Sequence, residues 1–494
     1  MTCLAALLLA ATFTRSLERV NSLDPIESQS VYDSHAVQLL YRTPLEIDYE
    51  ARPYRLVPGA CELPEVSADG LVYVFRMAPH DGTGLPVTGA DIVRSLERLR
   101  DPNSASPGGW TMKSVDTLRV REDGAVEIRL KERSHVFPWM MAMSYAGIRT
   151  ADGGATGPFV LDSWRKNHEM VFRRRVPAAD GFDTVRYLVV SDVSTQWLMF
   201  LKGELDFLGE ISRDNWDAVV DGDGGLDPQL ERAGVKLYGM PTLDVRYIGF
   251  NMKDPVLGAN RKLRQALTCA FDFPTWRAFY NNRVEPADGP VPRGVDGHLD
   301  APFPYPFDLA RAKRLLAEAG YPEGVDPATG RRLTLTLSIG NASSDGREAA
   351  ELLASFFARI GIRLEASFST WGAFMRAVNE GRVQVYMMGW VGDYPDAENF
   401  LQLFHSRNVS PGPNHSCYEN PAFDAAFDAA MACPDAAGRN VHWRRCQEIL
   451  REDCAWIYTH FPKAFSLVRP TVGHYIPSVF PYGEERHFKT GETK

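Results

Sequence analysis

The chain has 494 residues, of which 45% are hydrophobic and 24% charged, and its formal net charge is −9. This length predicts two or three lobes, and the apolar fraction excludes a disordered or fibrous chain. The net negative charge argues against nucleic-acid binding, which needs a basic surface to neutralise phosphates. No run reaches the roughly 18 apolar residues that a membrane-spanning helix needs. The sequence therefore predicts a globular protein with full cores.

The longest apolar run of the chain lies at its N-terminus, over residues 4–11. This length matches the hydrophobic core of a secretory signal, which is roughly 7–15 residues long. No Lys or Arg precedes the run, and no small-x-small cleavage site follows it clearly. We expect residues 1–16 to be a signal segment and the protein to be exported. A buried first helix, or a start that clips a longer signal, is the alternative.

The first third of the chain predicts short strands separated by polar turns. Segments 71–77 and 125–130 have the alternation of strands, and Thr88 is placed to cap a helix that runs to Arg100. The Gly-rich stretch 153–158 lacks the Gly-Lys-Ser/Thr ending of a phosphate-binding loop. It therefore predicts a turn before the next strand.

The C-terminal half alternates helices with strands. Asp308 is placed to cap a helix that Gly320 ends. This order predicts βαβ crossovers and a mixed or parallel sheet that is covered on both faces. We expect strands at 333–339, 362–369 and 383–390, and helices at 348–360 and 371–380.

Cysteines are concentrated near the C-terminus, where Cys417, Cys433, Cys446 and Cys454 contain no CxxC pair and fit no zinc template. Segment 420–453 predicts two antiparallel helices joined around residues 434–438. Cys417 precedes the first helix and Cys454 follows the second, so the two lie level with each other. We expect a Cys417–Cys454 disulfide, with reduced and buried thiols as the alternative.

Several short motifs follow one another between residues 20 and 455 in the order of one known family. Residues 310–324 read ARAKRLLAEAGYPEG, and residues 389–396 read GWVGDYPD. Shorter motifs that fit the same order are Ser22-Leu-Asp-Pro25, Val66-Ser-Ala-Asp-Gly70, Gly157-Pro-Phe159 and Asn420-Pro-Ala-Phe-Asp424. Together they resemble the family 5 extracellular solute-binding proteins, the dipeptide and oligopeptide receptors of ABC importers.

The resemblance implies an α/β fold of the periplasmic-binding-protein-like type II, with two hinge-linked lobes that close on a ligand in the cleft between them. Carried over to this chain, it implies lobe I at 17–45, 155–245 and 465–494. It further implies a small extra domain at 46–154 and lobe II at 246–464.

The resemblance also implies a function. It implies a receptor that binds peptides and delivers them to the permease subunits of an ABC transporter. We expect a periplasmic or extracellular location, with membrane association left open. We also expect a monomer that needs no cofactor, no metal ion and no nucleic acid.

The GWVGDY motif ends the last strand of the βαβ series, and α/β sheets bind ligands at the carboxyl ends of their strands. In peptide-binding members of the family, the Asp at the position of Asp393 pairs with the ammonium group of the peptide. Such a charge-assisted hydrogen bond is worth roughly 1.5–3 kcal/mol. We expect Trp390 to supply an apolar wall, Gly389 a close backbone approach and Tyr394 a hydroxyl. A turn that uses Asp and Pro for backbone reasons alone is the alternative.

Arg246 and Tyr247 lie on the strand that is expected to enter lobe II, and we expect both to face the cleft. Simple strand alternation is the alternative reading. In some tripeptide-binding members, an Arg two residues before the Gly-Trp pair binds the carboxylate of the peptide. That position is Met387 here, which leaves the length and chemistry of the ligand open.

A hydrolase or another enzyme that acts on peptides is the rival class. The 11 histidines form no HExxH motif, and no serine lies in a Gly-x-Ser-x-Gly elbow. His405 and His415 flank a loop that could hold a metal, but surface histidines are the commoner case. We therefore expect no catalytic residues and no metal site. A receptor of the same fold for a non-peptide solute is the other alternative.

Overall fold

The structure is a computed structural model that describes residues 11–28, 30–212, 215–220, 225–341, 343–410, 412–480 and 483–491. The chain divides into two compact units. The first unit contains the described residues up to Met240 and those from Ala464 onward, and the second is Pro241–Lys463. The expected lobe boundaries at 245–246 and 464–465 lie close to these crossings, and the expected extra domain falls within the first unit.

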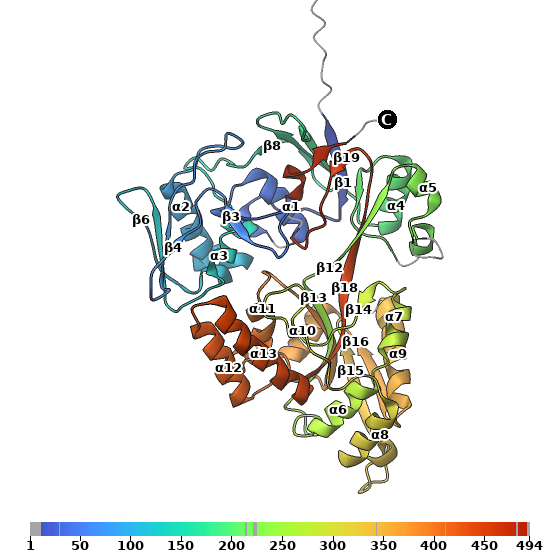
Figure 1. The fold of residues 1–494 in the computed structure, drawn as a ribbon. Helices are drawn as coiled ribbons and strands as arrows, with labels where there is room; N and C mark the ends of the chain where they lie inside the picture. Colours follow the sequence, from blue (N-terminus) through green and yellow to red (C-terminus); the bar gives the residue numbers. More distant parts are fainter. Residues whose placement is uncertain are drawn as a thin grey trace, which may run out of the picture. The chain divides into compact units, whose positions relative to one another are not determined.

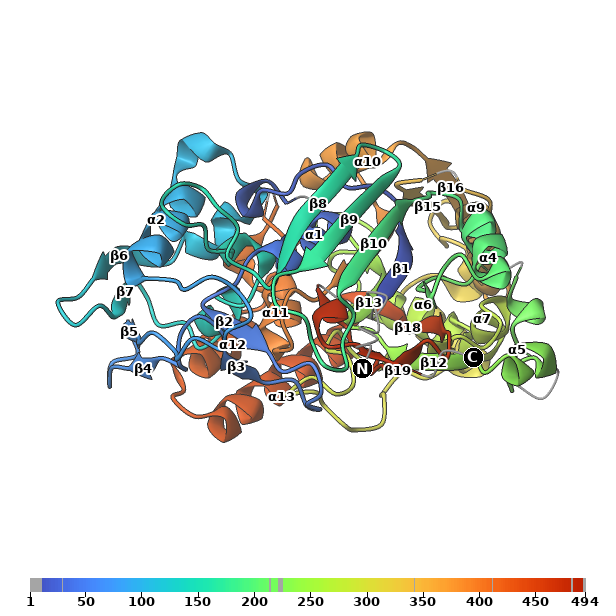
Figure 2. The ribbon, with the colours of Figure 1, turned by 90° about the horizontal axis from the view of Figure 1, so that it is seen from above.

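The first unit is built on a mixed sheet with the strand order β18-β11-β1-β10-β9-β8. Strand β1 (Thr12–Leu17) pairs in parallel with β10 (Thr184–Val189) and with β11 (Phe207–Leu208). Strands β9 (Glu169–Arg174) and β8 (Phe159–Arg165) extend the sheet in antiparallel fashion, and Figure 2 shows them beside β10 and β1.

Strand β1 overlaps the segment that the sequence predicts to be a signal. Phe13 and Leu17 are buried in the core of the first unit. The Arg15 guanidinium is also buried, and it pairs with Glu484 at 3.1 Å and Glu485 at 2.9 Å. Because the alternating Thr12–Leu17 segment is a strand of the folded core, the expected boundary at residue 16 is wrong. Residues 1–10 lie outside the described residues.

A smaller antiparallel sheet with the order β4-β5-β7-β6 lies within the first unit and has its own core. Helix α2 (Gly89–Arg100) contributes Ile92, Leu96 and Leu99 to that core. The Thr88 side chain accepts a hydrogen bond from the Asp91 N–H, so the predicted cap is confirmed. The strands of this sheet are β4 (Glu65–Val66), β5 (Val72–Phe75), β6 (Val115–Val120) and β7 (Val126–Leu130).

The other helices and strands of the first unit are α1 (Val31–Leu40), α3 (Phe137–Met140), α4 (Val193–Lys202), α5 (Pro228–Arg232), β2 (Leu45–Ile47), β3 (Leu56–Pro58), β19 (Val472–His474) and β20 (Lys489–Thr490). Two strands contain the crossings between the units: β12 (Lys236–Pro241) and β18 (Trp456–Val468).

The second unit is built on a sheet with the order β16-β15-β17-β13-β18. Strand β15 (Thr334–Ile339) lies in the middle of a parallel trio with β16 (Arg363–Phe368) and β17 (Val385–Val391). Strand β13 (Asp244–Phe250) then pairs in antiparallel fashion with β17 and with β18. The predicted mixed α/β sheet is confirmed.

Helices α9 (Ser344–Ala358) and α10 (Trp371–Asn379) supply the two crossovers of this sheet. The first leads from β15 to β16, and the second returns past β15 to β17. The order therefore reverses between β15 and β17, and the carboxyl ends of strands at such a reversal are where open α/β sheets bind ligands.

Helices α12 (Pro421–Ala432) and α13 (Ala436–Asp453) form the predicted helix pair, drawn in orange-red in Figure 1. Cys417 and Cys454 are both free thiols, so the structure contradicts the predicted disulfide. The two ends of the pair are joined instead through Asp453, whose carboxylate accepts hydrogen bonds from Tyr418 Oη at 2.6 Å and Asn420 Nδ2 at 2.9 Å. Cys454 Sγ lies in the core and donates to the Arg451 carbonyl at 3.4 Å.

Asp308 caps α8 (Leu309–Glu318) as predicted, because its side chain accepts a hydrogen bond from the Arg311 N–H. Within the described ranges, no helix has the length and hydropathy that a membrane crossing requires. The remaining elements of the second unit are α6 (Arg261–Ala270), α7 (Phe273–Phe279), α8 (Leu309–Glu318), α11 (Ala397–Leu401) and β14 (Val284–Glu285).

Candidate ligand-binding site

The candidate site lies where β17 ends beside the start of β13. Across this antiparallel ladder Val245 pairs with Trp390 and Arg246 with Gly389. The Gly392 N–H donates to the Leu243 carbonyl at 2.7 Å, so the turn after β17 is tied to the chain that enters β13. The structure thus brings five of the predicted site residues together at the carboxyl end of β17 and its adjoining turn. They are Arg246, Gly389, Trp390, Asp393 and Tyr394.

Asp393 lies in this turn with its side chain exposed. Desolvation by the surrounding protein nevertheless raises the pKa of its carboxyl, and the nearby Asn399 side chain opposes this effect. No cation among the described residues offsets the desolvation. An exposed carboxylate in such surroundings gains stability when a cation binds next to it.

Asn399 connects Trp390 and Asp393, two of the residues that the sequence predicts to contact the ligand. Its Oδ1 accepts one hydrogen bond from Trp390 Nε1 at 2.8 Å and another from the Asp393 N–H at 3.3 Å. Asn399 itself is fully buried. The sequence interpretation missed this residue, although a polar side chain directly before the apolar pair Phe400-Leu401 was a signal that could have pointed to it.

Gly389 does not leave open space above the sheet. A Cβ atom at this position would lie 2.5 Å from Arg246 Nη1 and 2.6 Å from Arg246 Cδ. The Arg246 side chain therefore lies across Gly389 and takes the room that was expected for a ligand backbone. This is a correction to the expected role of Gly389.

Arg246 is exposed, as expected for a residue that meets a ligand. Its Nη2 lies 3.4 Å from Asp244 Oδ2. Burial raises the pKa of the Asp244 carboxyl, and the Arg246 charge acts in the opposite direction. The region around the carboxyl end of β17 therefore contains both a cation, Arg246, and the carboxylates of Asp244 and Asp393.

Tyr247 and Tyr394 differ from their expected roles, because both are buried. The Tyr247 ring stacks on Trp456 with 3.4 Å between ring centroids and an angle of 3°. The Tyr394 hydroxyl donates to a carboxylate oxygen of Glu398. Both side chains serve the packing of the second unit, and neither presents a surface to a ligand.

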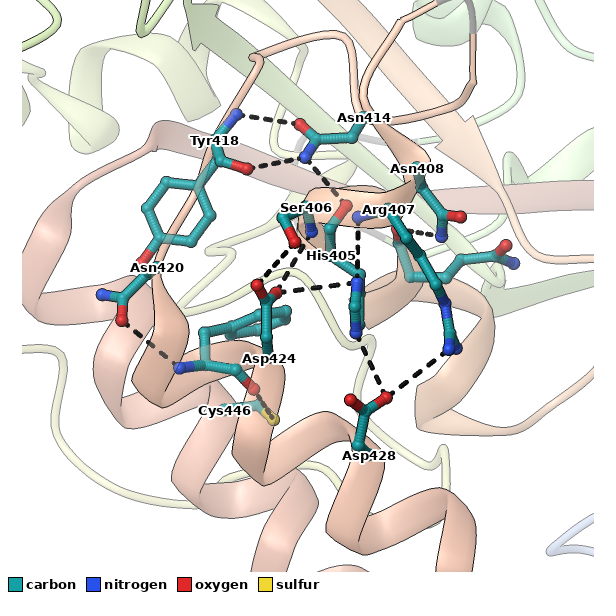
Figure 3. Close-up of polar contacts among 12 residues, drawn as sticks. His405, Ser406, Arg407, Asn408, Asn414, Tyr418, Asn420, Asp424, Asp428 and Cys446 are labelled. Carbon is teal, nitrogen blue, oxygen red and sulfur yellow. Dashed lines mark hydrogen bonds and ion pairs between the residues drawn. The ribbon is translucent and has the colours of Figure 1, made fainter.

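The loop after α11 contains the histidines that were considered as metal ligands. Figure 3 shows the His405 ring between two carboxylates of α12, with Nδ1 3.6 Å from Asp424 Oδ1 and Nε2 3.2 Å from Asp428 Oδ1. Asn414 Nδ2 donates to the carbonyls of His405 and Tyr418. His405 is buried rather than at the surface. The network fastens the loop to α12.

His415 is the second histidine of this loop. Burial lowers the pKa of its ring, and its Nδ1 lies 3.4 Å from Ser410 Oγ. In the part of the chain that the structure describes, no group of three or more His, Cys, Asp or Glu side chains is arranged to hold a metal ion.

Known proteins resemble this chain over nearly its whole length. The family described as "Bacterial extracellular solute-binding proteins, family 5 Middle" matches residues 55–411. Heme-binding protein A of Haemophilus influenzae is 26% identical over 481 residues, covering 88% of this chain and 84% of that protein. The dipeptide-binding protein of Escherichia coli is 24% identical over 512 aligned positions, covering 94% and 90%.

Solved structures give the same picture of the fold. HbpA2 from Haemophilus parasuis is 23% identical with a TM-score of 0.81, covering 95% of this chain and 98% of that chain. The periplasmic murein tripeptide-binding protein MppA, in its unliganded open form, is 20% identical with a TM-score of 0.80, covering 98% of each chain. At these identities the likeness establishes the fold.

Proposed function

Since the chain belongs to the bacterial extracellular solute-binding proteins of family 5, we propose that it binds a peptide with a free amino terminus and delivers it to the permease subunits of an ABC transporter. Relatives named as dipeptide-, di/tripeptide- and glutathione-binding proteins support this class of ligand. The observation that carries the proposal is Asp393, an exposed carboxylate whose surroundings raise its pKa.

The ammonium group of a peptide suits Asp393 because it supplies the cation that the turn lacks. A charge-assisted hydrogen bond between them is worth roughly 1.5–3 kcal/mol. The half-buried Trp390 ring offers apolar surface to the first side chain of the peptide. Arg246 then offers a guanidinium to the carboxylate at the other end of a short peptide. The ligand leaves chemically unchanged, since the proposal needs no reacting group.

The other parts of the proposal follow from family membership. The protein acts as a monomer in the periplasm or outside the cell, and association with a membrane stays a prediction. Closure of the lobes about a hinge also stays a prediction. A ligand that binds only the folded state raises the free energy of unfolding of the protein by mass action.

The test is calorimetric titration with a library of free di- and tripeptides, each paired with its N-acetylated form. We expect N-acetylation to weaken binding by about tenfold or more, which is the worth of one charge-assisted hydrogen bond. The same titrations are made with Asp393→Asn. The matched control for this variant is Asp396→Asn in the same turn, because Asn caps α11 as well as Asp does. Equal affinity for both forms of every peptide would overturn the ammonium role.

A second candidate is a planar solute that carries carboxylates, such as haem. The similarity to heme-binding protein A favours it, and the exposed Arg246 guanidinium suits a carboxylate of such a solute. Titration with haem, followed by its absorbance, distinguishes the two candidates. Haem binding without any peptide binding would favour the second.

A further inference from the structure

Asn399 occupies the centre of the turn that carries Trp390 and Asp393. Its single carbonyl oxygen accepts from Trp390 Nε1 at 2.8 Å and from the Asp393 N–H at 3.3 Å. Both partners are N–H donors, so the hydrogen-bond network itself fixes which end of the amide faces them. One buried oxygen therefore sets the plane of the indole ring and the path of the backbone at Asp393.

The nitrogen end of the same amide acts on the Asp393 carboxyl. Nδ2 of Asn399 is buried and has no hydrogen-bond partner of normal geometry among the described residues. The Asn399 side chain lowers the pKa of the Asp393 carboxyl, against the desolvation that raises it, and it acts in the same direction on the pKa of the Tyr394 hydroxyl. The amide thus supports the ionised form of the carboxyl.

The support for Asn399 is rigid. Asp396 caps α11 by accepting a hydrogen bond from the Glu398 N–H at 2.9 Å. Phe400 and Leu401, the next residues of the helix, are fully buried. A side chain held on such an element has little freedom, which is what the precise placement of neighbouring groups requires.

We propose that Asn399 is a positioning residue of the ligand site, which holds the Trp390 ring and the Asp393 carboxyl so that both meet the same ligand. This inference rests on the proposed function, in which Trp390 and Asp393 contact the ligand. Asn399 itself acts through these two residues and not by touching the ligand.

Other charges lie near the turn and are kept constant in the test. The titratable and charged side chains on the elements packed against Asp393 are Asp244 and Arg246 of β13, Tyr394 and Asp396 of the turn, Glu398 of α11, and Asp296, whose backbone forms a bridge to Asp396.

Two variants separate the two ends of the amide. Asn399→Asp keeps an acceptor for the indole and for the backbone N–H, but it loses the donor to Asp393 and adds a negative charge. Asn399→Leu has a similar volume and loses both functions. The matched control is Asn251→Ala, because Asn251 is also buried and binds the carbonyls of Gly381 and Val383 before the start of β17.

The first measurement uses the protein without any peptide. In protein labelled with ¹⁵N-tryptophan, the Trp390 indole signal is identified with Trp390→Phe. In protein labelled with [4-¹³C]aspartate, the titration of Asp393 is identified with Asp393→Asn. In Asn399→Leu we expect the indole signal to move and the Asp393 midpoint to rise. Asn399→Asp should restore the indole signal but raise the midpoint further.

Asn251→Ala should change neither signal, although it lowers the free energy of unfolding. If both signals of Asn399→Leu coincide with the wild type, the positioning role is overturned. Should Asn399→Leu fail to fold, Asn399→Asp still decides, since an unchanged Asp393 midpoint in that variant overturns the role.

The second measurement is affinity for the free peptide of the library that gives the largest thermal shift. At neutral pH we expect Asn399→Leu to weaken binding by tenfold or more and Asn251→Ala to leave it within twofold. Equal losses in both variants would overturn the positioning role. If the wild type binds no peptide, the proposed function fails, while the peptide-free signals still decide the placement by Asn399.

Discussion

The guanidinium of Arg246 lies across Gly389, the residue that it faces in the ladder between β13 and β17. Two features that look independent in the sequence, a glycine before a tryptophan and an arginine about 140 positions earlier, are therefore one structural unit. The exposed cation at the edge of the sheet depends on the missing side chain of its partner.

Gly389→Ala tests this relationship directly. The new Cβ would meet Nη1 and also the inner atom Cδ of Arg246, so the whole side chain must move. We expect a loss of no more than about 1 kcal/mol in the free energy of unfolding, the low end of the range for overpacked sites, because the exposed Arg246 side chain can move towards solvent. In an Arg246→Ala background the same substitution should cost much less, and a double-mutant cycle from urea denaturation measures the difference. Equal costs in both backgrounds would contradict the contact.

Asp393→Asn separates binding from stability. The carboxyl has a raised pKa in the folded protein, so its ionised form at pH 7 opposes folding rather than favouring it. We therefore expect the variant without ligand to be as stable as the wild type or more stable. Its affinity for free peptides should fall by about tenfold or more. Calorimetry and thermal unfolding check both parts, and a variant that binds peptides normally would exclude the ammonium role.

Peptide affinity should also depend on pH through Asp393. A bound ammonium favours the carboxylate and lowers its pKa, so binding releases protons where the free carboxyl is still partly protonated. We expect affinity to fall as the pH falls from about 7 towards about 4, near the ordinary range of Asp. Titrations in two buffers with different ionisation enthalpies measure the released protons. Asp393→Asn should remove this release, and an unchanged release in that variant would assign it to another group.

Glu484 makes the stability of the first unit depend on pH. Burial raises its pKa to about 8, and the nearby Glu485 acts in the same direction while Arg15 opposes it. The folded pKa lies above the unfolded one, so the stabilisation is complete below about pH 4.3 and is lost as the pH rises through 8. Glu484→Gln should reduce the loss of unfolding free energy between pH 6 and 9, measured in urea. The exposed Glu122→Gln should not, and equal slopes in both would refute the assignment.

The sequence predicted the local elements well because short-range signals determine them. Thr88 and Asp308 cap the helices that follow them, and the alternation at 333–339 gives β15. The helix before β16 begins at Ser344 rather than 348, because Ser343 accepts a hydrogen bond from the Gly346 N–H. The first turn after this exposed cap, residues 344–347, contains no hydrophobic residue, so the hydrophobic periodicity of the helix could not reveal it.

Side-chain roles at the site were less predictable, because they depend on partners far away in the chain. Tyr247 follows the exposed Arg246 but is enclosed by Trp456 and Tyr386 from other strands, and the pairing of β13 with β18 shifts register between Arg246 and Tyr247. The position of Asn399 before Phe400-Leu401 gives only a weak signal, since its role depends on the two N–H donors that reach its oxygen. The disulfide failed for a similar reason: helices that lie level do not fix where two thiols point.

The path of the chain sets an order for biosynthesis. The second unit is one uninterrupted segment whose ends meet where the Thr242 N–H donates to the Pro462 carbonyl at 3.1 Å. The first unit is different, because Arg15 in β1 pairs with Glu484 and Glu485, which lie about 470 residues later in the chain. As the chain emerges from its N-terminal end, the second unit can finish folding while the first unit is still incomplete, so the buried charge of Arg15 stays without its partners until the C-terminal segment has also emerged.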